Sequence, residues 1–448
     1  MGQPRRRRAR RGRFARSRRR VDDRFGRVRR RRLHGPMRAV AAAALSMTMV
    51  AAPPFVVGTM GPGISADLGL SVPALAGTVS FGYLVAAVAS PLGGLAVQRV
   101  GPSRALRLAA ALASVGVALV AVAQGPATLA MAFVALGMAN AVIQPASNGT
   151  LATAVTGRRQ GAVFGIVQSA VPAATLLAGL LLASFDDVRP WRQAMVILLV
   201  ATLLPQLVVP RRLAHESHVP RRARGWSTVA HRGTLLALCA GGFMGSAAAT
   251  TVAVFGVASG LSSGLSPTAA AGGLVLGSLC CIAGRILTSC RWGDHAPRRL
   301  LLDIAGLQIT GVLGIVLVGT GTTAGYLVGI AFAFGCGWGW TGLLNIAVTR
   351  VWSGRVASVT GVMQSGLFGG SVAGPLVFGA VADQTGYLAA WLVAAGALAV
   401  AASAGAVAGL LHRAGWTTGR GSSSTTPHGR LSRPGEQNRS RPTRAHRR

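Results

Sequence analysis

Long apolar segments alternate with short polar breaks through most of the chain. Each segment has about the length of the roughly 20-residue helix that crosses a bilayer, and the breaks contain the Pro, Gly, Asp and Arg residues typical of loops. The pattern therefore predicts an all-α membrane protein with twelve transmembrane helices. We expect these helices over residues 38–61, 73–98, 104–123, 127–150, 160–184, 191–210, 234–258, 267–291, 300–320, 324–348, 357–381 and 388–411.

The composition supports a membrane protein. Hydrophobic residues make up 51% of the 448 residues and charged residues only 12%, whereas charged residues make up about 25% of a typical soluble domain. This balance excludes an ordinary soluble enzyme, a disordered chain and a disulfide-rich secreted module. The five cysteines lie in or beside apolar runs without metal-ligand spacing, so we predict small buried residues, no metal site and no cofactor.

The arginines set the orientation of the predicted helices. All 46 basic residues are arginine, and 43 of them fall on the cytoplasmic side if the N-terminus is cytoplasmic. Basic loops favour the cytoplasmic side of a membrane. We therefore expect both termini in the cytoplasm and a multi-pass protein of the cell (plasma) membrane.

The longest internal polar loop divides the predicted helices six and six. This division predicts two six-helix bundles, over residues 38–210 and 234–411, joined by a cytoplasmic linker over residues 211–233. An Arg-rich disordered arm precedes them over residues 1–37, and an Arg/Ser/Pro-rich disordered tail follows over residues 412–448.

The two halves share a weak internal repeat. The stretch Gly165-Ile166-Val167-Gln168-Ser169 matches Gly361-Val362-Met363-Gln364-Ser365 at an offset of 196 residues. A Gly-Arg pair lies upstream of both stretches, and similar basic loops follow the second and eighth helices. Because membrane transporters often contain such duplications, the repeat predicts two pseudo-symmetric six-helix bundles.

The chain resembles the major facilitator superfamily of secondary transporters over about residues 38–411. The resemblance rests on the two-by-six layout, the central basic loop and the loop after the second helix, where Gly94, Arg99, Gly101 and Arg104 fit the family pattern of a cytoplasmic gating loop. Gln98 stands where the family usually has Asp, and the family's antiporter signature in helix five is missing. The resemblance implies a monomeric permease, not an enzyme, that moves a small solute by alternating access. A drug or metabolite efflux antiporter, a polytopic membrane enzyme and a membrane sensor remain as alternatives.

Polar side chains within the helices are the candidate substrate contacts, because unpaired polar groups are costly inside a membrane. We select the residues Gln168, Gln364, Gln144, Asn140, Tyr83 and Trp338. The competing interpretation is that such amides join helices by hydrogen bonds, and we favour it for Asn148 and Asn345.

Arg285 is the one arginine clearly inside a predicted helix, about six residues from its cytoplasmic end, whereas the others in the predicted ranges lie at or near helix ends. It could bind an anion, extend its charged group to the membrane surface, or pair with Asp303. The other acidic residues and the histidines lie in predicted loops or arms, so the mostly uncharged lining favours a neutral or amphipathic solute.

The Arg-rich arm suggests contact with anionic lipids of the inner leaflet. It shows no aromatic or fold pattern for nucleic acid, so we expect no nucleic-acid partner. Met37, just before the first helix, leaves open that translation starts there and that residues 1–36 are not part of the native protein.

Overall fold

The computed structural model describes residues 36–155, 157, 159–185, 190–209 and 231–421. Nearly all of the expected arm and linker and most of the tail lie outside this part of the chain. The last helix continues through residues 412–421, the first ten residues of the expected tail. A helix that is already formed lengthens readily, since each added residue gains one hydrogen bond.

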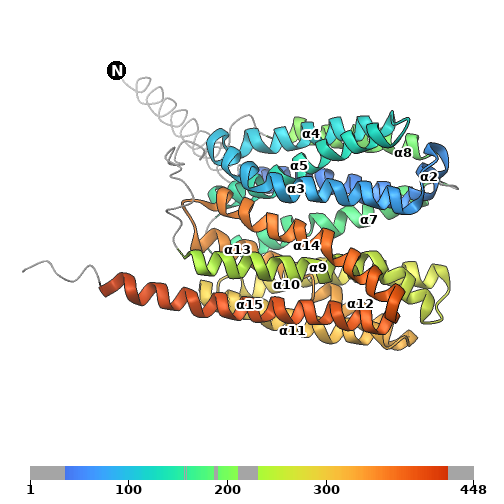
Figure 1. Ribbon diagram of the computed structural model, residues 1–448. Helices are drawn as coiled ribbons and strands as arrows, with labels where there is room; N and C mark the ends of the chain where they lie inside the picture. Colours follow the sequence, from blue (N-terminus) through green and yellow to red (C-terminus); the bar gives the residue numbers. More distant parts are fainter. Residues whose placement is uncertain (1–35, 156, 158, 186–189, 210–230, 422–448) are drawn as a thin grey trace, which may run out of the picture.

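The described residues form helices joined by short loops (Figure 1). The first helix is Pro36–Thr59. The helices that follow it are α2 Gly61–Leu68, α3 Val72–Val100, α4 Pro102–Ala121, α5 Pro126–Ala154, α6 Arg159–Gln168, α7 Ala170–Ala183, α8 Trp191–Val208, α9 Arg232–Ser262, α10 Pro267–Trp292, α11 Pro297–Gly319, α12 Thr323–Gly335, α13 Thr341–Val351, α14 Val356–Thr385 and α15 Tyr387–Gly421.

The starts of α3 and α10 show the same local chemistry. Ser71 and Ser266 cap these helices, and their hydroxyls accept hydrogen bonds from the N–H groups of Ala74 and Ala269, each at 3.3 Å. A proline follows each cap within two residues, where its missing N–H does no harm. The duplicated pattern thus fixes where both helices begin.

Eleven helices of the described residues are long and apolar enough to cross a membrane. The prediction of one continuous helix over 324–348 is wrong, because α12 ends at Gly335, a turn follows, and α13 starts at Thr341. Three glycines fall at or within this break, at positions 335, 337 and 339, and glycine weakens a helix by about 1 kcal/mol relative to alanine.

The helices of the N-terminal half of the chain (residues 36–209) lie together, and those of the C-terminal half (residues 231–421) lie beside them (Figure 1). The two halves meet where α3 packs against α14 and where α6 and α7 pack against α10. These two contacts position the candidate site.

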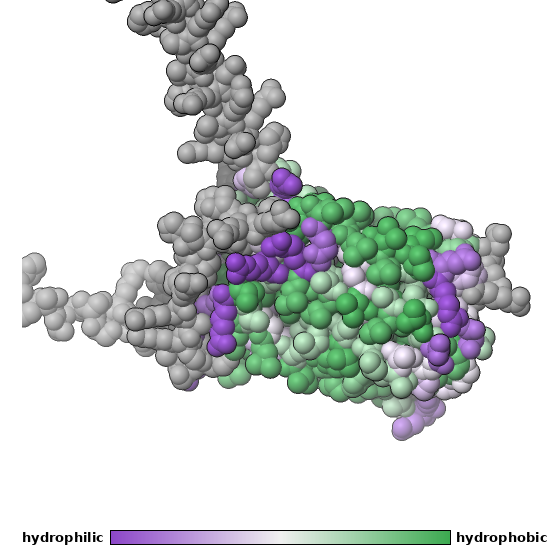
Figure 2. Space-filling model, turned by 90° about the horizontal axis from the view of Figure 1, so that it is seen from above, coloured by the Kyte–Doolittle hydropathy of each residue, from purple (hydrophilic) through white to green (hydrophobic). Residues whose placement is uncertain are grey.

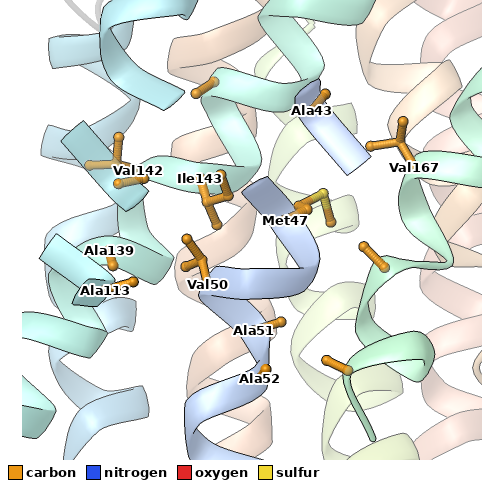
Figure 3. Close-up of a cluster of buried hydrophobic side chains, with 14 of the residues drawn as sticks. Ala43, Met47, Val50, Ala51, Ala52, Ala113, Ala139, Val142, Ile143 and Val167 are labelled. Carbon is orange, nitrogen blue, oxygen red and sulfur yellow. The ribbon is translucent and has the colours of Figure 1, made fainter. Parts of the chain in front are cut away.

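The first helix lies at the centre of the N-terminal half. Its side chains Ala43, Met47 and Val50 lie between Ile143 of α5 and Val167 of α6 (Figure 3), and all five belong to one buried cluster. Many of its members are alanine or valine, so these helices approach closely, as small residues allow in membranes.

The face shown in Figure 2 carries a broad apolar band with hydrophilic residues at its two ends. Many large apolar side chains of the described residues are exposed, among them Leu92, Leu207 and Leu313. Exposed leucine on this scale is typical of a surface that faces lipid. We call the end of the molecule that carries Arg99, Arg159 and Arg291 the basic face.

Candidate functional site

Two seams join the halves of the chain near the basic face, and both depend on glycine. In the seam between α3 and α14, a Cβ atom added to Gly94 would lie 2.5 Å from the carbonyl oxygen of Ala357 and 3.0 Å from the Cα of Gly361. In the seam between α6 and α10, a Cβ atom added to Gly165 would lie 2.9 Å from the carbonyl oxygen of Arg285. Neither seam has room for a larger residue, so both pairs of helices touch through their backbones.

The repeat found in the sequence places the two seams in correspondence. Gly165 and Gly361 are repeat mates, and the atom nearest to an added Cβ is the Arg285 carbonyl oxygen in one case and the Ser90 carbonyl oxygen in the other. Arg285 and Ser90 therefore occupy equivalent positions in the two seams. Both seams thus contain a small residue of the repeat, but only the α6–α10 seam contains a charged side chain.

Each seam contains a backbone carbonyl that a proline has left without its helical partner. In an α-helix the N–H of each residue donates to the carbonyl four residues earlier, and proline has no N–H. Pro172 therefore frees the carbonyl of Gln168, and Pro91 frees that of Ala87. Pro172 also explains why α6 ends at Gln168 and α7 begins at Ala170.

The opposite half of the chain supplies the donors for both freed carbonyls. The Ser365 hydroxyl of α14 donates to the Ala87 oxygen over 2.5 Å, and Arg285 Nη1 of α10 donates to the Gln168 oxygen. Both bonds join the halves, one by a neutral donor and one by a charged donor.

Arg285 is buried, with 2% of its surface exposed. Besides Gln168, its Nη2 donates to the carbonyl oxygen of Trp338 over 3.4 Å, and the guanidinium carbon lies 5.5 Å from the centre of the Trp338 ring. Trp338 stands in the turn between α12 and α13, where the backbone is outside both helices. The interpretation that Arg285 extends to the membrane surface is wrong, because its charged group points into the contact between the halves.

The expected pair of Arg285 and Asp303 is also wrong. Asp303 lies 2.6 Å from His295 Nδ1 and 3.1 Å from Arg299 Nε. The other ion pairs among the described residues join Arg192 to Asp67 and Arg350 to Asp294. Within the described part of the chain, Arg285 therefore has backbone oxygens, and not a carboxylate, as its oxygen partners.

A network of buried amides lies between the two seams. Asn345 Oδ1 of α13 accepts from Asn148 Nδ2 over 2.5 Å and from Gln144 Nε2 over 3.2 Å. Asn148 also donates to the Thr360 hydroxyl over 3.1 Å and accepts from Gln168 Nε2 over 3.4 Å. These bonds connect α5 of one half with α13 and α14 of the other, as expected for amides that join helices.

The other predicted contact residues take different positions. Asn140 donates to the Leu136 carbonyl of its own helix over 3.0 Å, and Gln364 is buried in α14. Tyr83 of α3 stacks on Phe368 of α14, with 6.1 Å between ring centres. Gln144 and Gln168 thus belong to the amide network, and Trp338 lies beside Arg285. Tyr83 lies farther along the α3–α14 seam. The side chain of Asn140 bonds to the backbone of its own helix.

The predicted gating loop lies at the basic face. Gly101 links α3 to α4 with a φ of +91°, a conformation that favours glycine, and Arg99 and Arg104 are exposed. Gln98 lines a small cavity of about 70 Å³ together with Arg355 and other residues at the start of α14. Gly94 is the member of this motif that makes the closest contact with the opposite half.

Burial along α14 shows where the halves are closest. Residues 356–361, at the basic face, are all buried, whereas residues 365–369 and 371–375 are half-buried. Access to this helix therefore increases away from the basic face.

The sequence interpretation missed Ala87, Pro91, Ser289 and Thr360. A usable signal existed for the first two, since a proline in an apolar helix marks a free carbonyl four residues before it. Nothing in the sequence indicates that Ser289, whose buried hydroxyl has no partner among the described residues, lies against Gly165 and Gly342. No three His, Cys, Asp or Glu side chains of the described residues are placed to hold a metal ion.

Comparisons with known proteins agree with this architecture. The human organic anion transporter MFSD10 (TETRAN) has a TM-score of 0.63 and 13% identity over 83% of this chain and 99% of that chain. The fucose:proton symporter FucP of E. coli has a TM-score of 0.65 and 13% identity over 84% of this chain and 99% of that chain. FucP in the outward conformation has a TM-score of 0.65 and 13% identity over 82% of this chain and 98% of that chain. No curated protein sequence matches the chain.

At these identities the solved structures show that the fold is shared. The family model described as Major Facilitator Superfamily matches residues 35–375, from just before the first helix into α14. This match covers most of the sequence, including both seams and the amide network. The chain belongs to the major facilitator superfamily of membrane transporters.

Proposed function

We propose that this protein moves a small solute across the plasma membrane by alternating access between two six-helix bundles, residues 38–210 and 234–411. The observation that carries the proposal is the pair of glycine seams at the basic face. Among the described residues, the side-chain hydrogen bonds that join the bundles are few: those of Ser365, Arg285 and the amide network, and one between the Thr175 and Ser278 hydroxyls in the α7–α10 contact. Rigid-body rocking of two repeats around a central site is a general transport device.

The proposal includes a topology of twelve crossings with both termini in the cytoplasm. At 1.5 Å per residue, helices of 13 and 11 residues reach about 20 Å and about 17 Å, so neither alone spans a hydrocarbon core of about 30 Å. Together with the turn between them they span it, and α12 and α13 then form one crossing. The basic face is the cytoplasmic face in this topology.

The bundle interface supplies the proposed solute contacts. Gln144 and Gln168 bond across the bundles, and Trp338 lies beside Arg285. Gln364 is buried in α14, which packs against α3 of the other bundle. Tyr83 lies on α3 and Asn140 on α5, which both contact α14. The protein acts as a monomer, and its arginine-rich arms contact anionic lipids.

Spin-label distances test alternating access without knowledge of the solute. One label pair at Arg99 and Arg291 reports on the basic face, and a second pair at Gln124 and Ser262 reports on the opposite face. All four positions are exposed, and the labels are introduced as cysteines after the five native cysteines are replaced.

The Gly361→Val variant serves as the trigger, because its side chain collides with α3 and prevents closure of that seam. We expect the distances at the basic face to lengthen and those at the opposite face to shorten relative to the parent protein. Gly396→Val is the matched control, since a Cβ atom there meets nothing within 4 Å. Distances that lengthen at both faces, or that do not respond, would contradict alternating access.

A further inference from the structure

We propose that the Arg285 guanidinium binds the acidic group of the transported solute, a carboxylate or a phosphate. This inference rests on the proposed transport function and names the class of its substrate. It replaces the expectation of a neutral solute, which came from a lining without mid-span acids.

The first argument is the electrostatics of the buried charge. Removing one cation from water costs several kcal/mol unless an opposite charge and good hydrogen bonds compensate it. Arg285 is 2% exposed, and its oxygen partners among the described residues are two backbone carbonyls. The Cys281 thiol, one helical turn earlier, also lies within hydrogen-bonding reach, but it is a weak acceptor. An anion is therefore the missing partner.

The second argument is the geometry of the guanidinium. Nη1 donates to the carbonyl oxygen of Gln168. Nη2 makes only the 3.4 Å hydrogen bond to the carbonyl oxygen of Trp338, and Nε has no partner among the described residues. Nε and Nη2 lie on the same edge of the planar group. That edge is the one that binds carboxylate or phosphate through two parallel hydrogen bonds.

The surroundings of this edge also suit an anion. The Trp338 ring lies beside the guanidinium, and the buried Ser289 hydroxyl, one turn along α10, has no partner among the described residues. The helix α13 begins three residues after Trp338, and no side chain caps its first N–H groups. The N-terminus of a helix favours negative charge.

Movement of the bundles would change the number of donors that the anion meets. Gln168 belongs to one bundle and Arg285 to the other, so separation at the basic face removes the Gln168 carbonyl and releases Nη1. An anion then compensates the charge. We therefore expect anions to favour the arrangement that is open at the basic face.

The test measures thermal unfolding of the purified full-length protein with charged probes and their uncharged analogues. The pairs are benzoate and benzamide, lactate and lactamide, and glucose 6-phosphate and glucose, at equal ionic strength. A ligand that binds the folded state raises the unfolding temperature. We expect at least one anion to raise it while its neutral analogue does not.

Variants of α10 assign the effect to Arg285. Arg285→Gln is expected to weaken binding of that anion at least about tenfold, and Arg285→Lys, which keeps the charge but not the two-donor edge, by less. Arg291→Gln removes an equal charge from an exposed position of the same helix and is expected to bind as the parent protein does. If Arg285→Gln does not fold, the probe pairs and Arg285→Lys still decide the question.

Three results would overturn the proposal. They are equal protection by charged and neutral analogues, undiminished anion binding in Arg285→Gln, and no protection by any anion of the set. The spin-label pairs separate this failure from failure of the transport proposal. Opposite distance changes at the two faces without an anion effect would mean that the protein alternates and that Arg285 is only a clamp between bundles.

Discussion

The two seams have the same construction and differ in one residue. In both, a repeat glycine, Gly361 or Gly165, contacts the backbone of a helix from the opposite half, and a proline supplies a free carbonyl. Ser90 in the α3–α14 seam is replaced by Arg285 in the α6–α10 seam. The comparison teaches that the two seams share their close backbone packing, whereas only the α6–α10 seam contains a charged group. The packing therefore suits closure of both seams, and the charge of Arg285 needs a separate explanation.

The largest expected effect comes from filling either glycine. We expect Gly361→Val and Gly165→Val to disfavour closure at the basic face by a similar amount, near the upper end of the about 1–3 kcal/mol that overpacking costs. The Arg99 and Arg291 spin-label distances measure the open fraction. Gly179→Val, in the α7 part of the same membrane-spanning segment as Gly165, is the control, because a Cβ atom there meets nothing within 4 Å. A strong effect at only one seam would break the proposed equivalence.

The next effect concerns the amide network between the seams. Asn345→Ala leaves the amides of Gln144 and Asn148 without their shared acceptor, and an unsatisfied buried donor costs about 1–3 kcal/mol. We expect a lower thermal stability and a larger open fraction in the same distance measurement. Asn140→Ala is the matched control, because Asn140 bonds only to its own helix among the described contacts. If both variants open the basic face equally, the network does not join the bundles.

The smallest effect separates the charged bond from the neutral one. Pro172→Ala and Pro91→Ala each restore an N–H that competes for the freed carbonyl. A hydrogen bond to a charged group contributes about 1.5–3 kcal/mol and a neutral one about 0.5–1.5 kcal/mol, so competition should displace Ser365 more readily than Arg285. We therefore expect Pro91→Ala to open its seam slightly more than Pro172→Ala opens its own. The free energies of closure of the two variants should differ by about 1 kcal/mol. The reverse order would mean that Arg285 contributes little to closure.

The sequence predicted most helices because apolar runs of bilayer length have few alternatives. It failed at the tenth helix, where hydropathy stays high across the glycines that end α12 at Gly335. Length and hydropathy report on lipid contact and do not detect a break inside an apolar segment, whereas the glycines at 335, 337 and 339 weaken the helix there. The repeat predicts related helices, and in the structure its two glycines, Gly165 and Gly361, lie in the two seams.

The candidate site was only partly predictable. The amide of Gln168 was selected for its side chain, yet its backbone oxygen makes the contact with Arg285. That contact needs Pro172 on one helix and an arginine on another helix, more than a hundred residues away in the sequence. No local pattern connects the two. Asn148 and Asn345, favoured as joining residues, do bond to each other across the halves.

The prolines in the seams also determine what enters when the bundles part. The carbonyls of Ala87 and Gln168 have no donor in their own helices, so each needs one in every arrangement of the protein. Hydrocarbon provides none, and an unsatisfied carbonyl there costs several kcal/mol. A seam that opens must therefore be filled by water or by a polar solute rather than by lipid tails. The bundles can therefore separate at these seams only if water or a polar solute reaches the carbonyls of Ala87 and Gln168.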